Sequence, residues 1–515
     1  MDTSLILVGL ENALTFQNLL FIVAGCSIGL VVGALPGLSA TMALALLLPL
    51  TFSLPAETGL CMLAALYLSA MYGGSIAAIV LRTPGTPAAA ATVMDGFPMA
   101  ASGQAGRALG ISLSASLVGG IISGVALLTV APFLGQIVLL FGPVELFAIA
   151  VLGITMIGTL SKGSPIKGLF SGAIGLLLAM VGMDPTTGTA RFTFDSLDLY
   201  AGIPFTVALI GLFSLPQALA LVEQARARRN PPNQISDRVL VRPAEFLRLL
   251  PNTLRSSVIG VVTGLIPGTG GDTASWFAYN EAKRFARDKS KFGKGDPAGI
   301  AAPEAANNAV VGGALIPTIA LGIPGSSSTA VLIGALMVHG ILPGPTLLTE
   351  YGDVTYTLIW AVILTNIPLF LVGLLFTRLS IAVTKVPPVA VAVAIVVLSV
   401  IGAFAINNSL FDVWLMLVFG VLGYILERAG IPTAPMVIGL VLGMLLDNTL
   451  NQSMLIGYGE WTVFTDSPIA ITLLAIAAFS MLQATPLGGW ICRLFRRRKA
   501  AESGVSKNPL YGQGN

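Results

Sequence analysis

Long apolar runs separated by short polar segments make up most of this chain. Runs long enough to cross or half-cross a bilayer lie near 18–35, 39–54, 58–83, 107–131, 134–160, 166–183 and 200–222, and again near 253–267, 304–322, 326–348, 356–377, 388–406, 411–426, 432–449 and 466–486. Because one helical crossing takes about 20 apolar residues, this pattern predicts roughly 12 transmembrane helices together with shorter pieces.

Four of these runs are interrupted by a Pro-Gly pair with hydroxyl side chains beside it. The pairs are Pro36-Gly37, Pro84-Gly85, Pro267-Gly268 and Pro324-Gly325. Proline removes a backbone donor and disrupts a helix, while glycine allows a turn and close approach. In hydrocarbon the freed N–H and C=O groups are costly unless they face protein, water or a ligand. The breaks are therefore expected to line a site.

The breaks form two pairs, which indicates an internal repeat. Pro36 and Pro267 are offset by 231 positions, Gly73 and Gly312 by 239, and Pro84 and Pro324 by 240, a growth explained by an inserted basic stretch at 283–294. The lysine-containing loop at 161–167 is expected inside, whereas its counterpart at 407–408 carries no cation and is expected outside. Inverted repeats with broken helices are typical of secondary transporters whose site lies at the repeat interface.

The composition supports a membrane protein and limits its chemistry. Charged residues make up only 10% of the 515 residues, and 55% are hydrophobic, whereas soluble domains carry roughly 25% charged residues. Three scattered cysteines and a single histidine offer little material for a disulfide framework, a metal site or acid–base catalysis. The sequence also lacks a Walker-type Gly-Lys-Ser/Thr motif. We therefore expect neither an enzyme nor an ATPase.

The placement of lysine and arginine predicts the orientation and the domain division. Cations concentrate in 226–248, 283–294 and 493–499, which are expected in the cytoplasm, while the acidic stretch 184–198 is expected outside. Binding of anionic lipid or nucleic acid is the less favoured explanation of the basic segments. The predicted division is 1–222 for the first membrane repeat, 223–252 for a cytoplasmic linker, 253–489 for the second repeat and 490–515 for a cytoplasmic tail. The N-terminus lacks the basic region of a signal peptide, so we expect it to be retained.

The substrate-binding candidates flank the four breaks. A half-helix that begins after a break directs its N–H groups and positive dipole end toward the break, where a carboxylate can bind. Neighbouring hydroxyls add neutral donors. The candidates are Pro36, Gly37, Ser39, Thr83, Pro84, Gly85, Thr86, Pro267, Gly268, Thr269, Pro324, Gly325, Ser326 and Ser327. The alternative is that the breaks are kinks whose small residues allow tight helix packing.

The ion-coupling candidates are Asp272, Thr273, Glu304, Asn307 and Asn308. An intramembrane carboxylate is costly, so Asp272 is expected to coordinate a cation or take up a proton, or else to cap a helix. Glu304, Asn307 and Asn308 share a helix face at the opening of the next span. They could line the site and hold sodium, or form a hydrogen-bond cluster between helices.

Two further polar residues allow alternative interpretations. Arg82 precedes the second break, where it could bind an anionic substrate, extend to the membrane surface or pair with Asp95. The single histidine, His339, is expected at a helix end near the membrane surface rather than in a proton relay.

Several motifs together resemble the large membrane subunit of the tripartite tricarboxylate transporters, the TctA family, over roughly 15–485. The motifs are Gly33-Ala34-Leu35-Pro36-Gly37-Leu38, Tyr72-Gly73-Gly74-Ser75, Thr83-Pro84-Gly85-Thr86-Pro87-Ala88, Asp95-Gly96, Gly264-Leu265-Ile266-Pro267-Gly268, Pro303-Glu304-Ala305-Ala306-Asn307-Asn308-Ala309 and Leu321-Gly322-Ile323-Pro324-Gly325-Ser326.

The resemblance implies a permease of the bacterial inner membrane that works with a TctB-like small membrane subunit and a TctC-like periplasmic solute-binding protein. It also implies uptake of citrate or a related carboxylate, coupled to an ion gradient with sodium as the expected ion and no other cofactor. Two other functions stay open from the residues alone. One is a stand-alone ion–carboxylate symporter of another inverted-repeat family; the other is an intramembrane enzyme, which the scarcity of catalytic groups disfavours.

Overall fold

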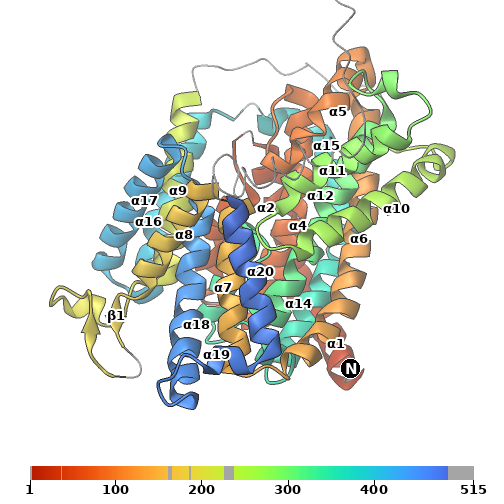
Figure 1. The fold of residues 1–515 in the computed structure, drawn as a ribbon. Helices are drawn as coiled ribbons and strands as arrows, with labels where there is room; N and C mark the ends of the chain where they lie inside the picture. Colours follow the sequence, from red (N-terminus) through yellow and green to blue (C-terminus); the bar gives the residue numbers. More distant parts are fainter. Residues whose placement is uncertain are drawn as a thin grey trace, which may run out of the picture.

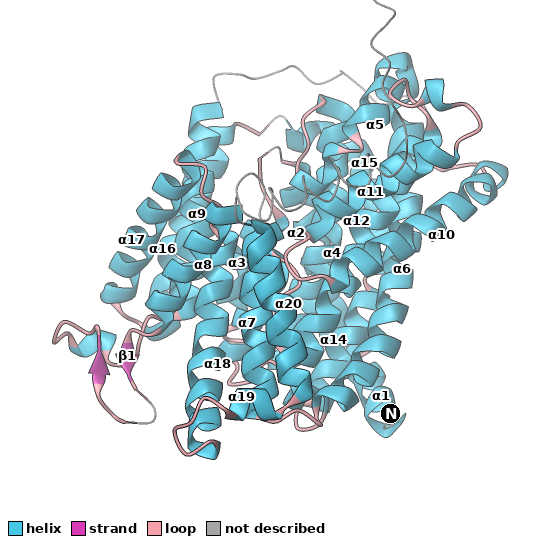
Figure 2. Ribbon diagram, viewed as in Figure 1, coloured by secondary structure: helices cyan, strands magenta, loops and turns pink. Residues whose placement is uncertain are grey.

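The computed structural model describes residues 3–35, 37–160, 165–184, 187–224, 237–384 and 386–484. The described chain is almost entirely helical, with one short hairpin of two antiparallel strands (Figure 2). The elements before residue 225 are α1 (Thr3–Ala13), α2 (Phe16–Ala34), α3 (Ala40–Leu47), α4 (Ala56–Leu81), α5 (Val93–Met99), α6 (Ala105–Val138), α7 (Pro143–Leu160), α8 (Pro165–Ala179), β1 (Gly182–Met183), β2 (Ala190–Arg191) and α9 (Phe205–Gln224), with short turns of 3-10 helix at Leu48–Thr51, Pro87–Ala90 and Leu197–Leu199 and of π-helix at Ala100–Gln104.

The second part of the chain continues with helices only. These are α10 (Pro243–Leu265), α11 (Gly270–Phe285), α12 (Pro297–Leu321), α13 (Ser327–Val338), α14 (Gly352–Leu364), α15 (Asn366–Thr384), α16 (Pro388–Asn407), α17 (Leu410–Arg428), α18 (Ala434–Ile456), α19 (Val463–Asp466) and α20 (Pro468–Ala484), with 3-10 turns at Lys289–Lys291 and Pro345–Leu348.

The predicted all-α polytopic architecture is confirmed. Within the described residues, 8 helices are long and apolar enough to cross a membrane, and several shorter apolar helices accompany them. Individual bounds differ from the predicted runs. Helix α6 continues through Pro132 to Val138, because a proline inside a helix does not always end it. Helix α12 begins at Pro297 rather than near 304, and α10 begins at Pro243, inside the segment predicted as a linker.

Glycines bring α2 and α4 of the first repeat, and α10 and α12 of the second repeat, into direct backbone contact. In the first repeat, Gly25 and Gly33 of α2 lie against the carbonyls of Met62 and Ala70 on α4. In the second, Gly260 of α10 lies against Ala306 of α12, and Gly264 lies against Gly313. In both pairs the contacts advance in the same direction along the two helices, so the helices are parallel. A side chain at these glycines would push the backbones apart.

The two repeats run in opposite directions. Asn18 and Thr58, near the starts of α2 and α4, are hydrogen-bonded at 2.6 Å, and the start of α4 at Gly59 also lies near His339, after the end of α13. At the other end of the molecule, the segment just before α12 binds Asp95 of α5. Hence α4 and α5 run one way and α12 and α13 run the other, as the inverted-repeat prediction requires.

Helices α3 and α11 turn back after the first break of each repeat. Helix α11 packs antiparallel to α12, with the Ser275 hydroxyl donating to the Pro303 carbonyl at 3.3 Å. Helix α3 ends near Thr51, which lies against Gly59 at the start of α4. Each repeat therefore contains a hairpin that enters from one end of the molecule and returns to it, and the two hairpins enter from opposite ends.

A second group of helices faces these hairpins. It contains α8, α9, α17 and α18, packed through Gly175 of α8 against Met436, and through Gly211 of α9 against Met416 and Gly420. Helix α9 also contacts α3 and α13, and α18 contacts α13. The breaks thus lie between the hairpins and this second group.

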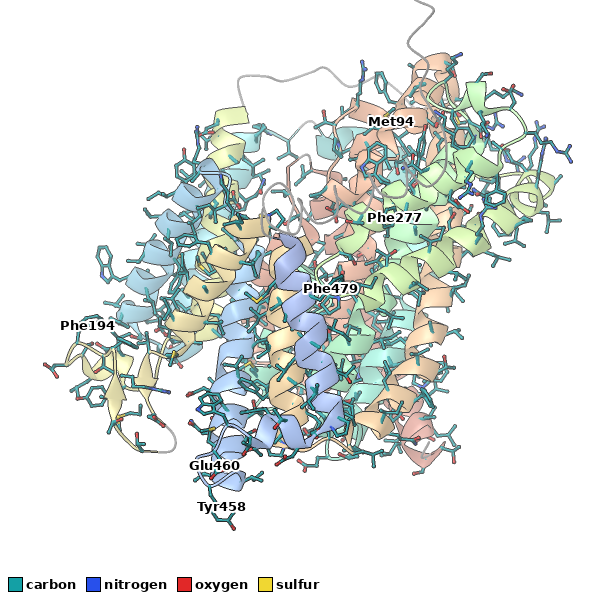
Figure 3. The ribbon with its side chains drawn as sticks, viewed as in Figure 1. Met94, Phe194, Phe277, Tyr458, Glu460 and Phe479 are labelled. Carbon is teal, nitrogen blue, oxygen red and sulfur yellow. The ribbon has the colours of Figure 1, made fainter. Side chains whose placement is uncertain are left out.

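The predicted cytoplasmic and external charged segments lie at opposite ends of the molecule. The ends of α5 and α11 and the loop that follows α11 lie at the top of Figure 1, whereas α1, α19 and the β1–β2 hairpin lie at the bottom. In Figure 3, Met94 marks the upper end, and Phe194, Tyr458 and Glu460 mark the lower end. The basic stretch 283–294 and the described part of the acidic stretch 184–198 therefore lie at opposite ends of the molecule. Which of these ends faces the cytoplasm stays a prediction.

Candidate functional site

Residues from all four breaks surround one cavity of about 400 Å³. The lining comes from the start of α3, the turn before α5, the start of α11 and the start of α13, and the second helix group closes it on the other side. It consists of Ser39–Thr41, Tyr67, Met71, Thr86–Ala88, Phe213, Gln217, Gly268–Thr273, Ser326–Ser328, Glu427, Pro432, Ala434, Pro435 and Ile438. A volume of this size fits a small organic acid.

The glycines of the breaks serve two different purposes. Gly37 and Gly268 have φ values of 88° and 82°, a left-handed conformation that glycine adopts readily and that reverses the chain into α3 and α11. At Gly85 the space for a side chain is taken by the Gly33 carbonyl, and at Gly325 it is taken by Ala314 at 2.6 Å. The close approach at these two positions is therefore made by the protein's own backbone.

Hydrogen bonds join the breaks to one another, both within the second repeat and between the two repeats. The Gly268 N–H donates to the Gly325 carbonyl at 2.9 Å. The Thr41 hydroxyl lies 2.9 Å from that of Ser328, and the Tyr67 hydroxyl lies 3.1 Å from that of Ser326. The cavity wall is thus a single hydrogen-bonded structure built from both repeats.

Three helix N-termini begin at the cavity, and their caps differ. The Ser39 hydroxyl accepts the Met42 N–H of α3 at 3.1 Å, and Ser326 forms a reciprocal capping box with Thr329 at the start of α13. Thr269 precedes α11 but makes no side-chain cap; its hydroxyl instead donates to the carbonyls of Thr263 and Ile266. The first turn of α11 therefore offers N–H groups that no threonine cap occupies.

The charge of the cavity wall is negative. Its described lining contains the carboxylates of Asp272 and Glu427 and no lysine or arginine. Asp272 lies in the first turn of α11, three residues after the cap position, so it is not the N-cap of this helix. An anion in the cavity would depend on neutral N–H and O–H donors.

The structure separates the predicted substrate-binding residues into two sets. Ser39, Thr86, Gly268, Thr269, Ser326 and Ser327 line the cavity. Gly37 lies beside it, since the amide of the lining residue Gln217 donates to the Gly37 carbonyl. The predicted residues absent from the described lining are Thr83, Pro84, Gly85, Pro267, Pro324 and Gly325. Pro36 lies outside the described residues.

The predicted ion-coupling residues also divide. Asp272 and Thr273 line the cavity, while Glu304, Asn307 and Asn308 are fully buried within α12. The Asn307 amide donates to the Met71 carbonyl at 3.2 Å, and the Asn308 amide donates to the Ser116 carbonyl at 3.3 Å. These asparagines therefore connect helices through their amide N–H groups, and they lie inside α12 rather than at its opening.

Glu304 lies among hydroxyl groups contributed by the first repeat. Its carboxylate accepts from Ser75 at 2.5 Å, from Ser112 at 3.0 Å and from Ser116 at 3.3 Å, and it is also bonded to Thr92. These partners belong to α4, to α6 and to the turn before α5. A single carboxylate of the second repeat thus holds three segments of the first repeat together.

Arg82 and Asp95 do not pair with each other. The Arg82 guanidinium lies 5.5 Å from the centre of the Phe97 ring, while Asp95 is buried and is bound by the loop before α12. His339 directly follows the end of α13, which confirms that it is a helix-end residue.

Three lining residues with polar or charged side chains lie on helices away from the breaks, and the sequence did not predict them. Tyr67 lies in the middle of α4, Gln217 follows a proline inside α9, and Glu427 is next to the last residue of α17. A polar side chain within an apolar run was the available signal for Tyr67 and Gln217.

Comparison with known proteins places these features in context. A family model described as the tripartite tricarboxylate transporter TctA family matches residues 19–438. A protein of Agrobacterium vitis, described as an uncharacterized 52.8 kDa protein in the TAR-I ttuC' 3'region, is 36% identical over 468 residues, covering 91% of this chain and 93% of the relative. A second protein of that organism, described as lying in the TAR-II ttuC' 3'region, is 36% identical over 225 residues, 44% of this chain and 93% of its own length. No solved structure matches the chain.

Proposed function

The chain belongs to the tripartite tricarboxylate transporter TctA family, and on this premise we propose that it is the permease subunit of a cation-coupled carboxylate uptake system. It is a multi-pass membrane protein of a tripartite transporter. The proposal adds that it takes up tricarboxylates or related organic acids such as citrate, with sodium as the coupling ion. The proposed partners are a TctB-like small membrane subunit and a TctC-like periplasmic solute-binding protein, in the bacterial inner membrane.

The observation that carries this proposal is the cavity formed by the four breaks. It lies between inverted repeats, and the N-termini of α3, α11 and α13 begin at its wall. Hydrogen bonds from N–H and O–H groups to a charged acceptor contribute about 1.5–3 kcal/mol each. Three or four of them support binding in the micromolar to millimolar range after desolvation is subtracted.

The negative wall supports coupling to a cation. A multivalent carboxylate that enters beside Asp272 and Glu427 meets two like charges and no basic side chain in the described lining. Repulsion between buried like charges is strong because the dielectric is low. A co-bound cation offsets this repulsion, so the carboxylate and the cation each favour binding of the other.

Reconstitution tests the proposal. The chain is incorporated into proteoliposomes with the small subunit, and labelled citrate is presented on the binding protein with an inward sodium gradient. We expect chemically unchanged citrate to accumulate, and we expect dissipation of the gradient to abolish accumulation. Equal uptake when the small subunit and the binding protein are both omitted would favour the stand-alone symporter. Recovery of a compound chemically different from citrate would favour an enzyme. Failure of every tested di- and tricarboxylate to accumulate would refute the proposal.

A further inference from the structure

The internal symmetry relates pairs of residues that reach across the cavity. Helix packing sets the offset between α4 and α12 at 240 rather than 239 positions, because Gly73 lies against Gly33 and its counterpart against Gly264 is Gly313. This offset relates Tyr67 of α4 to Asn307 of α12, and it also relates Thr86 after the second break to Ser326 after the fourth. Tyr67 and Ser326 are hydrogen-bonded across the repeats at 3.1 Å. The symmetry therefore predicts an equivalent bond between Asn307 and Thr86.

That equivalent bond is missing. The Thr86 hydroxyl oxygen and the Asn307 Oδ1 are both buried, and neither has a hydrogen-bond partner in the described part of the chain. Thr86 is 3% exposed and Asn307 is fully buried. A buried polar atom without a partner costs about 1–3 kcal/mol, so native proteins rarely leave two near one cavity without a use for them.

The orientation of the Asn307 amide makes its oxygen available. Its Nδ2 donates to the Met71 carbonyl at 3.2 Å, and the reversed amide would place two oxygens against each other. The Oδ1 lies 2.7 Å from the position that a side chain on Gly271 would occupy. Gly271 lines the cavity next to Asp272, and Met71 and Thr86 line it as well. The free oxygen is therefore just behind the cavity wall at the start of α11.

A charge difference accompanies the missing bond. The offset of the first breaks, 231 positions, relates Thr41 to Asp272. In one half, Thr41 bonds to Ser328 at 2.9 Å and the wall is closed by neutral hydroxyls. In the other half, the equivalent of Thr41 is the carboxylate of Asp272. It lies next to Gly271, which is close to the unpaired Asn307 oxygen. Hydroxyl, amide and carboxylate oxygens are the ligands of hard cations.

We propose that the cavity has one sodium site, held by Thr86 Oγ1, Asn307 Oδ1 and the Asp272 carboxylate, and that the symmetry-related position around Tyr67 and Ser326 binds no cation. This inference rests on the proposed cation coupling and gives it a location. The ion joins the second break of the first repeat to α11 and α12 of the second repeat. It completes the contact that Tyr67 and Ser326 make by themselves in the other half.

Sodium binding by the purified chain tests this site without transport. We expect labelled sodium to bind saturably to the wild-type protein. Thr86→Val and Asn307→Leu keep the side-chain size but remove the oxygen ligand, and each should raise the half-saturating sodium concentration at least tenfold. Thr86→Ser keeps the hydroxyl and should restore binding to within about twofold of wild type. The matched control is Tyr67→Phe, which breaks the symmetry-related bond and should leave sodium affinity unchanged.

The outcomes separate this inference from the proposed function. Wild-type sodium affinity in folded Thr86→Val and Asn307→Leu proteins would overturn the site, as would the absence of sodium binding in a wild-type protein that still accumulates citrate. An equal loss of affinity in Tyr67→Phe would overturn the asymmetry. Elution of each variant as the wild-type species in size-exclusion chromatography, together with the Thr86→Ser result, distinguishes loss of a ligand from misfolding.

Discussion

Replacement of Asp95 should release the loop between α11 and α12. Asp95 Oδ1 accepts the four consecutive backbone N–H groups of 293–296 at 2.8–3.1 Å, and Oδ2 accepts the Tyr279 hydroxyl at 2.9 Å. The side chain is fully buried. One carboxylate of the first repeat thus organises a whole turn of the second repeat.

The size of the effect follows from the charge of the acceptor. A hydrogen bond to a charged group contributes about 1.5–3 kcal/mol, and one between neutral groups contributes about 0.5–1.5 kcal/mol. Asp95→Asn keeps the shape but removes the charge, a loss of about 1 kcal/mol for each bond. The four donors share one oxygen, so their contributions are not additive. We take about 2 kcal/mol as the total loss of stability of the closed loop in Asp95→Asn. This corresponds to a roughly 30-fold larger population of the open loop.

Limited trypsin digestion measures that population. Lys291 and Lys294 lie in or beside the bound turn, and cleavage there follows the fraction of molecules in which the turn is open. We expect Asp95→Asn to accelerate cleavage by about the same 30-fold factor. Glu281→Gln is the matched control, because it removes a carboxylate from a half-exposed ion pair on α11 and should change cleavage little. An unchanged rate in Asp95→Asn would show that the carboxylate does not hold the loop.

Four further outcomes are expected. In a cysteine-free background, a cysteine at Ser290 should resist an impermeant thiol reagent applied to intact spheroplasts, and one at Ser196 should react; the reverse pattern would invert the orientation. Asp272→Asn should reduce the dependence of uptake on sodium while membrane insertion is retained, and an unchanged dependence would remove this residue from coupling. Ser326→Ala removes a helix cap worth about 1 kcal/mol and a cavity hydroxyl, so the apparent KM for the carboxylate should rise several-fold; an unchanged KM would place the substrate elsewhere. Gly85→Val should prevent accumulation of folded protein, because its side chain would meet the Gly33 carbonyl, and normal expression would contradict the packing.

The sequence predicted the helix breaks and their inverted pairing, because proline, glycine and charge placement act locally. It could not predict which side of each break faces the cavity. Thr83 is exposed and donates to Leu81, while Thr86, three residues later, lines the wall. The difference depends on how the chain turns after Pro84, and that turn depends on backbone contact with the other helices.

Residues on one helix face also proved to have different surroundings. Glu304, Asn307 and Asn308 have the spacing of a common face, yet Glu304 contacts hydroxyls of α4 and α6, and Asn307 reaches toward α11. Spacing along a helix says nothing about which neighbour covers each side. Gln217 was missed for a related reason, since its partner, the Gly37 carbonyl, lies 180 residues away in sequence.

The surroundings of Glu304 also constrain how the chain is made. Helix α12 carries this carboxylate and two asparagines near its middle, and it is not among the described helices apolar enough to span a membrane by composition. An isolated charged residue at the centre of a helix opposes release from the translocon into lipid by about 2.5–3.5 kcal/mol. Every hydroxyl that binds Glu304 comes from α4, α6 or the turn before α5, segments that the ribosome synthesises first. We therefore expect the first repeat to assist insertion of the second, because α12 can then leave the translocon with its carboxylate bound by hydroxyls of the earlier segments.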